Sequence, residues 1–149
     1  FRRVLFRSEG SVGTNGGPAG DLLVEVSVQG HPIFQRDGSD VYCEMPITFV
    51  QAALGADLEV PTLDGKVRYS IPEGTQTGTT FRLRSKGIPV VGYAGRRGDQ
   101  YVTVVVETPR NLTAEQKDTL RKFGEELGDE ATPKRKGFFD KVKDSFKNI

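Results

Sequence analysis

The chain has 149 residues, of which 36% are hydrophobic, and its 21 Lys and Arg nearly balance its 20 Asp and Glu. The single cysteine, Cys43, excludes an internal disulfide framework or a cysteine-rich zinc cluster, and no apolar run approaches the roughly 18 residues that cross a bilayer. Acidic residues prevail over positions 9–133 and basic residues over 134–149, and an acidic body argues against a nucleic-acid-binding module. We therefore expect a cytoplasmic protein that holds no metal and no cofactor.

The amino-terminal part contains a leader and the first copy of a repeat. Residues 1–8 hold three Arg but no small-residue cleavage site, so we interpret them as a foreign leader and not as a signal peptide. Residues 20–28, GDLLVEVSV, return 78 positions later as residues 98–106, GDQYVTVVV, each after a glycine-rich loop. Residues 7–10 also resemble residues 84–87. A repeated turn and alternating strand predict a duplicated β unit.

These signals divide the rest of the chain into four parts. Residues 9–30 are predicted to be the end of a first, truncated β domain, and residues 31–110 a second β domain. A helix is expected within 111–128, and a basic tail follows at 129–149. The chain is thus expected to begin inside its first repeat.

The second β domain is predicted from alternating strands and turn signals. Buried positions at Val41, Cys43, Met45 and Ile47 alternate with polar ones, so Cys43 is expected in the core and not as a nucleophile. Further strands are expected at residues 58–60, 66–71, 81–84 and 100–106.

Two local signals mark turns in this domain. Thr48 is expected to cap a short helix at residues 49–54, which Gly55 ends. Asp64 and Gly65 predict a tight hairpin in which both residues adopt positive φ.

The carboxy-terminal part is predicted to be helical. Thr113 and Gln116 fit a capping box, and Gly128 ends the helix whose apolar face is made of Leu120, Phe123 and Leu127. In the tail, a second amphipathic helix is expected from the spacing of Phe139, Val142 and Phe146.

Catalysis is not expected. The only histidine, His31, lies beside a proline in a connector, and Cys43 lies in a strand, so neither a catalytic dyad nor a histidine metal site is available. We predict no catalytic and no metal-binding residue.

Four blocks, in order, resemble one family: residues 31–38 (HPIFQRDG), 53–65 (ALGADLEVPTLDG), 71–78 (IPEGTQTG) and 81–87 (FRLRSKG). They are similar to the carboxy-terminal half of the DnaJ family of bacterial J-domain co-chaperones. The resemblance implies a mainly β fold, with β-sandwich-like client-binding domains, short helices and a terminal dimerisation helix. It also implies unfolded protein segments as clients, a homodimer, and a DnaK-type chaperone as partner of the full-length protein.

Three departures from the family limit what the resemblance implies. The His-Pro-Asp motif that stimulates DnaK is absent, because Ile33 follows the only His-Pro. The zinc module, which needs four Cys-x-x-Cys pairs, is absent as well. Most of the first β domain, which holds the family's principal client pocket, is also missing.

Within the second β domain we predict an apolar set near a client groove: Met45, Ile47, Phe49, Leu54 and Val60. The alternative is that these residues form the core. Leu120, Phe123 and Leu127 are predicted to be the dimerisation residues, although their stripe has a second possible destination on its own β domain.

Two other functions compete with client holding. One is a structural dimerisation and spacer module without client affinity. The other gives the basic tail, with Lys134, Arg135 and Lys136 before an amphipathic stretch, a contact with an anionic membrane or nucleic acid. Our prediction of partners leaves out both nucleic acid and membrane.

Overall fold

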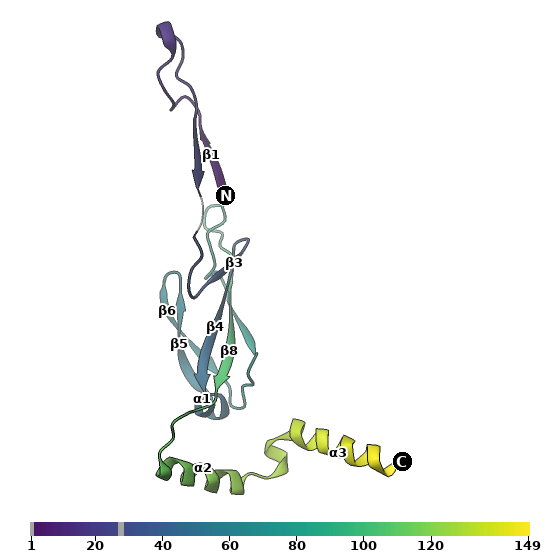
Figure 1. The fold of residues 1–149 in the computed structure, drawn as a ribbon. Helices are drawn as coiled ribbons and strands as arrows, with labels where there is room; N and C mark the ends of the chain where they lie inside the picture. Colours follow the sequence, from purple (N-terminus) through teal and green to yellow (C-terminus); the bar gives the residue numbers. More distant parts are fainter. Residues whose placement is uncertain (1, 27–28) are drawn as a thin grey trace. The chain divides into compact units, whose positions relative to one another are not determined.

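Strands dominate the first of the two units into which the chain divides, at Glu107 and Thr108 (Figure 1). The computed structural model describes residues 2–26 and 29–149. The elements of the first unit are β1 (Arg2–Phe6), η1 (Thr14–Gly16), β2 (Leu22–Val26), β3 (Gln35–Asp37), β4 (Asp40–Thr48), α1 (Phe49–Leu54), β5 (Ala56–Thr62), β6 (Gly65–Ile71), β7 (Thr80–Leu83) and β8 (Gln100–Glu107). A mainly β fold with short helices is confirmed.

Strand β1 makes residues 2–6, within the segment interpreted as a foreign leader, part of the fold. It pairs antiparallel with β2 along its whole length, from Arg2 opposite Val26 to Phe6 opposite Leu22. The three arginines and the missing cleavage site were evidence about a signal peptide. They do not indicate whether residues 1–8 can pair with a neighbouring strand. Residues 2–6 are one arm of a β-hairpin.

The β1–β2 hairpin repeats the geometry of β7–β8 and confirms the predicted duplication. Ser8 and Ser85 both have positive φ, 62° and 59°. The backbone N–H of Ser8 donates to Oδ1 of Asp21 at 2.8 Å, and that of Ser85 to Oδ1 of Asp99 at 2.9 Å. The strand registers correspond as well, with Phe6 opposite Leu22 and Leu83 opposite Gln100. Residues 2–6 are therefore the counterpart of β7.

A four-stranded sheet of order β3-β4-β8-β7 forms one layer of the domain. Its two central strands, β4 and β8, run parallel, with Val41 opposite Gln100 and Thr48 opposite Glu107, and the outer strands are antiparallel to them. The predicted alternation in β4 is confirmed, because Val41, Cys43 and Ile47 are buried while their neighbours face outward.

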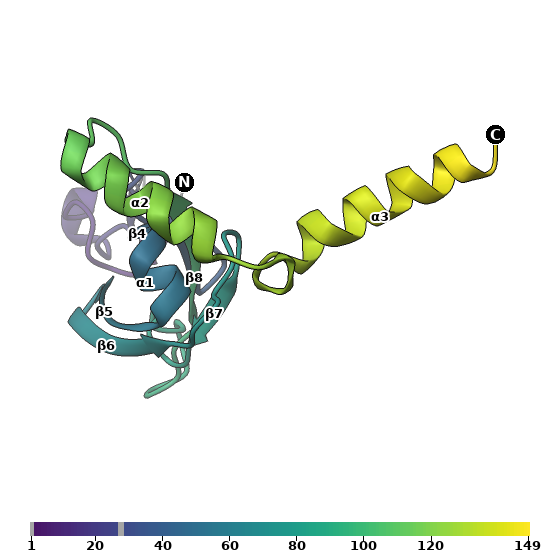
Figure 2. The same cartoon turned by 90° about the horizontal axis from the view of Figure 1, so that it is seen from below.

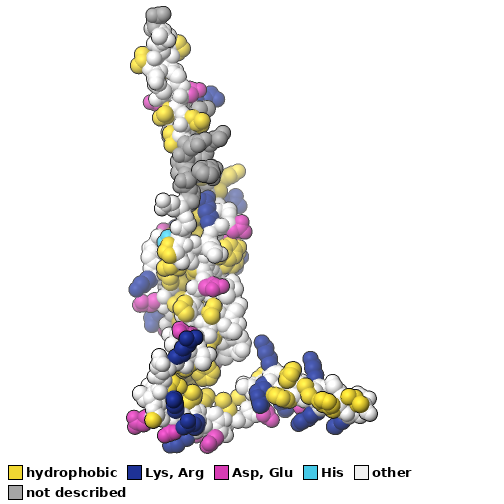
Figure 3. Space-filling view, in the orientation of Figure 1, with side chains coloured by type: hydrophobic (Ala, Val, Ile, Leu, Met, Phe, Trp, Pro, Cys, Tyr) yellow, Lys and Arg dark blue, Asp and Glu magenta, His cyan; other side chains and the backbone are white. Residues whose placement is uncertain are grey.

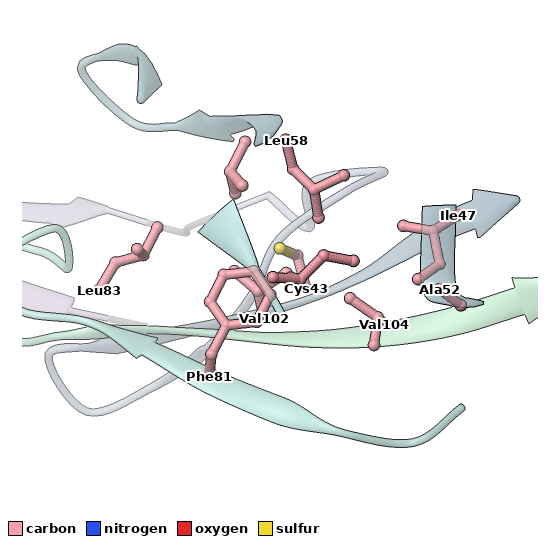
Figure 4. Close-up of a cluster of buried hydrophobic side chains, with 10 residues drawn as sticks. Cys43, Ile47, Ala52, Leu58, Phe81, Leu83, Val102 and Val104 are labelled. Atoms are coloured by element: carbon pink, nitrogen blue, oxygen red, sulfur yellow. The ribbon is translucent and has the colours of Figure 1, made fainter. Parts of the chain in front are cut away.

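The hairpin β5–β6 forms a second layer, and the core lies between the two layers (Figure 4). Side chains from both layers and from α1 make one buried cluster, whose members are Cys43, Ile47, Ala52, Leu58, Val60, Ile71, Phe81, Leu83, Val102 and Val104. The Tyr69 ring stacks on Phe81, with centroids 3.9 Å apart. This arrangement is the expected β-sandwich.

The short helix α1 has the ends that its sequence predicts. The Thr48 hydroxyl accepts from the Gln51 N–H at 3.1 Å, and the Gln51 side chain accepts from the Thr48 N–H at 3.0 Å. These two bonds make a capping box. At the other end Gly55 has φ of +77°, a conformation that glycine adopts without a steric penalty.

The hairpin between β5 and β6 differs from the predicted turn. Only Gly65 has positive φ, at +110°, whereas Asp64 does not. Thr62 lies opposite Gly65, and its hydroxyl accepts from the Asp64 N–H at 3.2 Å. The prediction that both turn residues adopt positive φ is wrong, because the Thr62 side chain holds the turn and leaves one residue, Gly65, in the left-handed region.

The second unit is helical, as predicted. It contains α2 (Ala114–Glu126), η2 (Asp129–Ala131) and α3 (Pro133–Lys147). Thr113 and Gln116 form the expected capping box at the start of α2. The helix ends at Glu126, shortly before Gly128. No described residue of α2 or α3 is buried within the chain.

Candidate functional site

The five residues predicted to lie near a client groove do not share one surface. Ile47 and Val60 are 3% and 0% exposed and belong to the core, and Met45 is half-buried against it. Phe49 and Leu54 are 44% and 68% exposed on α1. Only the α1 pair is available to a partner protein, because the core residues touch other parts of the sandwich.

Helix α1 presents an apolar surface that we call the α1 tip: Phe49, Val50 and Leu54. Val50, which our sequence analysis missed, is 60% exposed. At 100° per residue these three side chains span one arc, and the buried Ala52 faces the other way. The sequence contains this helical spacing, but a helix of six residues is too short for the spacing to indicate which side faces the core.

The α1 tip is held in place from both ends. Beside the capping box at Thr48, the N–H groups of Gly74 and Thr75 donate to the carbonyls of Ala53 and Ala52 at 3.2 and 3.0 Å. Figure 2 shows α1 beside the ends of β4 and β8, which it contacts. The exposed apolar side chains therefore sit on a fixed support.

A second candidate surface surrounds the connector before β3. One pocket of about 650 Å³ is lined by residues that include His31, Phe34, Leu63 and Ile88. Another of about 570 Å³ shares His31 and adds Tyr42. These lining residues were not predicted, although the connector was singled out as a motif, because its partners Leu63 and Ile88 come from distant loops.

The connector is shaped by its histidine. Nδ1 of His31 accepts from the N–H groups of Ile33 and Phe34 at 3.1 and 3.3 Å, and its ring lies 5.0 Å from that of Phe34. Next to it, Tyr42 stacks on Tyr101 at 5.1 Å. Desolvation and the nearby Asp40 and Asp37 raise the pKa of the Tyr42 hydroxyl, which is therefore uncharged at neutral pH.

The side chain of Asp99 organises the loop that precedes β8. It accepts from the Ser85 N–H at 2.9 Å, and Arg82 reaches its Oδ2 at 2.6 Å. The hydrogen bond from Ser85 and the charge of Arg82 hold the pKa of Asp99 below its usual range. Asp99 is therefore ionised and structural at neutral pH.

Cys43 lies in the core and is poorly suited to chemistry. Burial raises the pKa of its thiol, and its Sγ lies 3.6 Å from Nε2 of Gln100. Within residues 2–26 and 29–149 no three His, Cys, Asp or Glu side chains are grouped as a metal site would require. None of the helices in the described part is long and apolar enough to cross a membrane.

The predicted dimerisation residues form a half-exposed stripe on α2 and its C-cap residue, Leu127. Leu120, Phe123 and Leu127 are 45%, 40% and 42% exposed. Of the five side chains predicted for client contact, Phe49 and Leu54 are thus accessible. All three side chains predicted for dimerisation are accessible as well. Together with the connector pockets, they are apolar surfaces that a polypeptide could cover.

Comparison with known proteins matches almost the whole chain to one family. The model of the DnaJ C terminal domain matches residues 2–109, and that of the Chaperone protein DnaJ C-terminal region matches residues 115–148. The first match includes β1, so residues 2–6 lie within the matched domain.

Several curated relatives are named Chaperone protein DnaJ. The relative from Acetivibrio thermocellus is 58% identical over 95% of this chain and 36% of its own length. That from Clostridioides difficile is 58% identical over 97% and 37%, and that from Bacillus velezensis 57% over 93% and 37%. The chain thus spans less than two fifths of the length of these relatives.

Proposed function

Because this chain belongs to the DnaJ C-terminal domain family, we propose that it binds unfolded or partly folded protein segments and dimerises, without catalysing a reaction. The relatives are named as chaperones, which places the chain in a chaperone family. We further propose that the DnaK-type partner acts through the longer protein and that the work is done in the cytoplasm.

One observation carries the proposal for client binding. The core of the sandwich is complete without the α1 tip, yet Phe49, Val50 and Leu54 remain 44%, 60% and 68% exposed. Exposed apolar side chains that are not needed for packing indicate a surface for a partner. Unfolded chains expose apolar side chains on an extended backbone, and such segments suit this surface.

Dimerisation would raise the affinity for clients, which a surface as small as the α1 tip cannot provide alone. The three α1 side chains offer one weak site per chain, and two linked weak sites gain avidity of about 10² to 10⁴ without a new contact. The stripe of Leu120, Phe123 and Leu127 is half-exposed and suits a second copy of the helix. We therefore assign client contact to α1 and self-association to α2.

The alternative is a dimerisation and spacer module without client affinity. It is favoured by the burial of Ile47 and Val60, which removes them from the predicted client set. The two functions differ in whether the chain alone suppresses aggregation of a denatured protein.

An aggregation assay with matched variants separates the two functions. We expect the wild type to suppress aggregation of a denatured model protein, and Phe49→Ser with Leu54→Ser to weaken that suppression. The control is Val91→Ser, which removes a side chain that is 65% exposed in the glycine-rich loop. Absence of suppression in the wild type would leave the spacer function. Suppression that is equal in the wild type and both variants would show client binding through a surface other than α1.

A further inference from the structure

Helix α3 carries its apolar side chains on one side. With 3.6 residues per turn, the four side chains fall within an arc of about 100°. Phe138 and Phe146 are 61% and 72% exposed, and Phe139 is 45% exposed. The members of this arc are Phe138, Phe139, Val142 and Phe146. Three aromatic rings are thus held in water on one face of a single helix.

The charged residues of α3 have a fixed order around this arc. Lysines border it on both sides, and the two acidic residues lie at the middle of the opposite face. Lys134 and Lys141 lie on one border, Lys136, Lys143 and Lys147 lie on the other, and Asp140 and Asp144 lie opposite. Figure 3 shows the apolar side chains of α3 in a row with dark blue ones on both sides.

Arg135 is the one charged residue within the arc. Its guanidinium lies 4.9 Å from the centroid of the Phe139 ring, a cation–π contact that lets the charge stay close to an aromatic face. A stacked guanidinium remains able to reach an anion beyond the ring. The apolar arc is therefore bordered by cations on both sides and carries one on its surface.

This order of charges distinguishes between possible partners. Pairing α3 with a second α3 would place lysine rows beside lysine rows, which repel. A nucleic-acid duplex offers phosphates to the lysines but no apolar phase for three phenylalanines. An anionic lipid surface offers both, because lysine stems reach along the apolar region while their ammonium groups stay at the phosphates. The aspartates would then face water, away from the anionic surface.

We propose that α3 docks on an anionic lipid surface, with its axis in the plane of the interface and its phenylalanines at the acyl boundary. Helices of this kind bind through apolar area together with attraction to anionic lipids. The partners predicted from the sequence left membranes out, with a contact of the basic tail with an anionic membrane kept as an alternative; the order of side chains around α3 favours that alternative. Client binding by α1 plays no part in this proposal.

Vesicle flotation of the full chain tests the proposal. Vesicles of mixed phosphatidylcholine and phosphatidylglycerol should carry the chain at low ionic strength, and vesicles of phosphatidylcholine alone should not. The Lys143→Gln and Lys147→Gln double variant should reduce binding by roughly fivefold per lysine. The control is Lys117→Gln with Lys122→Gln, which removes two lysines from α2 and should leave binding within about twofold of the wild type.

The apolar arc is tested separately from the charges. Phe146→Ser should reduce flotation with mixed vesicles and leave the mass measured by light scattering unchanged. A variant that changes the mass and keeps lipid binding would show that the arc meets a second copy of the chain, and would overturn the proposal. Failure of the wild type to bind mixed vesicles at low ionic strength, or an equal loss in the α2 control, would overturn it as well.

Discussion

The side-chain amide of Gln100 donates from Nε2 to the carbonyl oxygen of Pro61 at 2.8 Å, and this bond joins the two layers of the sandwich. Gln100 is 0% exposed in β8, and Pro61 lies in β5 of the opposite hairpin. Its other amide atom, Oε1, is buried without a hydrogen-bond partner among the described residues. Burying a side-chain amide lowers the stability of the fold unless the amide is hydrogen-bonded, and in Gln100 the bond from Nε2 to Pro61 meets this need in part.

Gln100→Glu should therefore destabilise the domain by about 3 to 5 kcal/mol at neutral pH, because it places an unpaired charge in the core. Burial raises the pKa of the introduced carboxyl above about 4.3, its value in the unfolded chain. The variant should thus regain stability as pH falls, since the protonated acid can donate to Pro61. Urea unfolding at several pH values measures this, with the exposed Gln76→Glu as control. A pH-independent difference would contradict the prediction.

Gly98→Ala should destabilise the domain by about 1 to 3 kcal/mol, as overpacking does. A Cβ at Gly98 would overlap the carbonyl group of Ser39, where the glycine-rich loop meets the β3–β4 turn. The Ile88 N–H also donates to the Ser39 oxygen at 2.8 Å, so the two backbones cannot easily separate. Gly124→Ala in α2, where a Cβ has open space, is the control and should not destabilise. Equal melting temperatures for the wild type and Gly98→Ala would show that the loop can move aside.

Asp99→Asn should lose stability at neutral pH and approach the wild type in acid. The pKa of Asp99 is held down by Ser85 and Arg82, so the ionised form stabilises the native state. This stabilisation is complete above about pH 4, the unfolded value, and is lost as pH falls through the lower native pKa. The melting temperatures of the wild type and Asp99→Asn should therefore converge as the pH is lowered from 7. Asp118→Asn, which breaks the exposed pair with Arg121, serves as the comparison and should have little effect.

Gly65→Val should destabilise the β5–β6 hairpin by about 1 kcal/mol or more, because a β-branched residue is strained at the φ of +110°. Space is not the cause, since a Cβ at Gly65 meets nothing within 4 Å. Gly30→Val is the matched control: its Cβ also has open space, and its φ is not in the positive range. Thermal melts that coincide for both variants would remove the turn conformation as the cause.

Phe123→Ala should convert a dimer into a folded monomer at micromolar concentration and weaken client holding through lost avidity. If the stripe instead packs on the chain's own β domain, the same change should lower stability, by roughly 3 to 5 kcal/mol for a fully buried ring, without changing the mass. Light scattering and thermal melting measure both quantities. Lys122→Ala, on the same helix, is the control. A monomeric wild type, or a variant that stays dimeric, would exclude Phe123 as the anchor.

Local order was accessible from the sequence because it depends on neighbours along the chain. The alternation in β4, the caps at Thr48 and Thr113 and the helix stop at Gly55 were all predicted and observed. Even the duplication was readable, since a repeated strand needs only self-comparison. The error at Asp64 is local too, because a side chain two residues earlier, Thr62, took over the role assigned to the backbone.

The placement of the candidate site was less accessible. The alternation of Met45 and Ile47 shows one buried face but does not say whether a groove or a second layer covers it. The hairpin β5–β6 covers it, which buries Ile47 and Val60 and leaves Phe49 and Leu54 at the margin. The connector pockets were missed for the same reason, since their lining comes from separate loops.

By itself the sequence determined the family, most strands of the second β domain, the capped helices and the order of charges around α3, because each depends on residues close together in the chain. Only the tertiary structure decided the parallel pairing of β4 with β8, the burial of Gln100 against Pro61 and the role of residues 2–6 as the counterpart of β7. These features join segments far apart in sequence, and a partner strand is chosen by what the whole sheet buries and not by either strand alone.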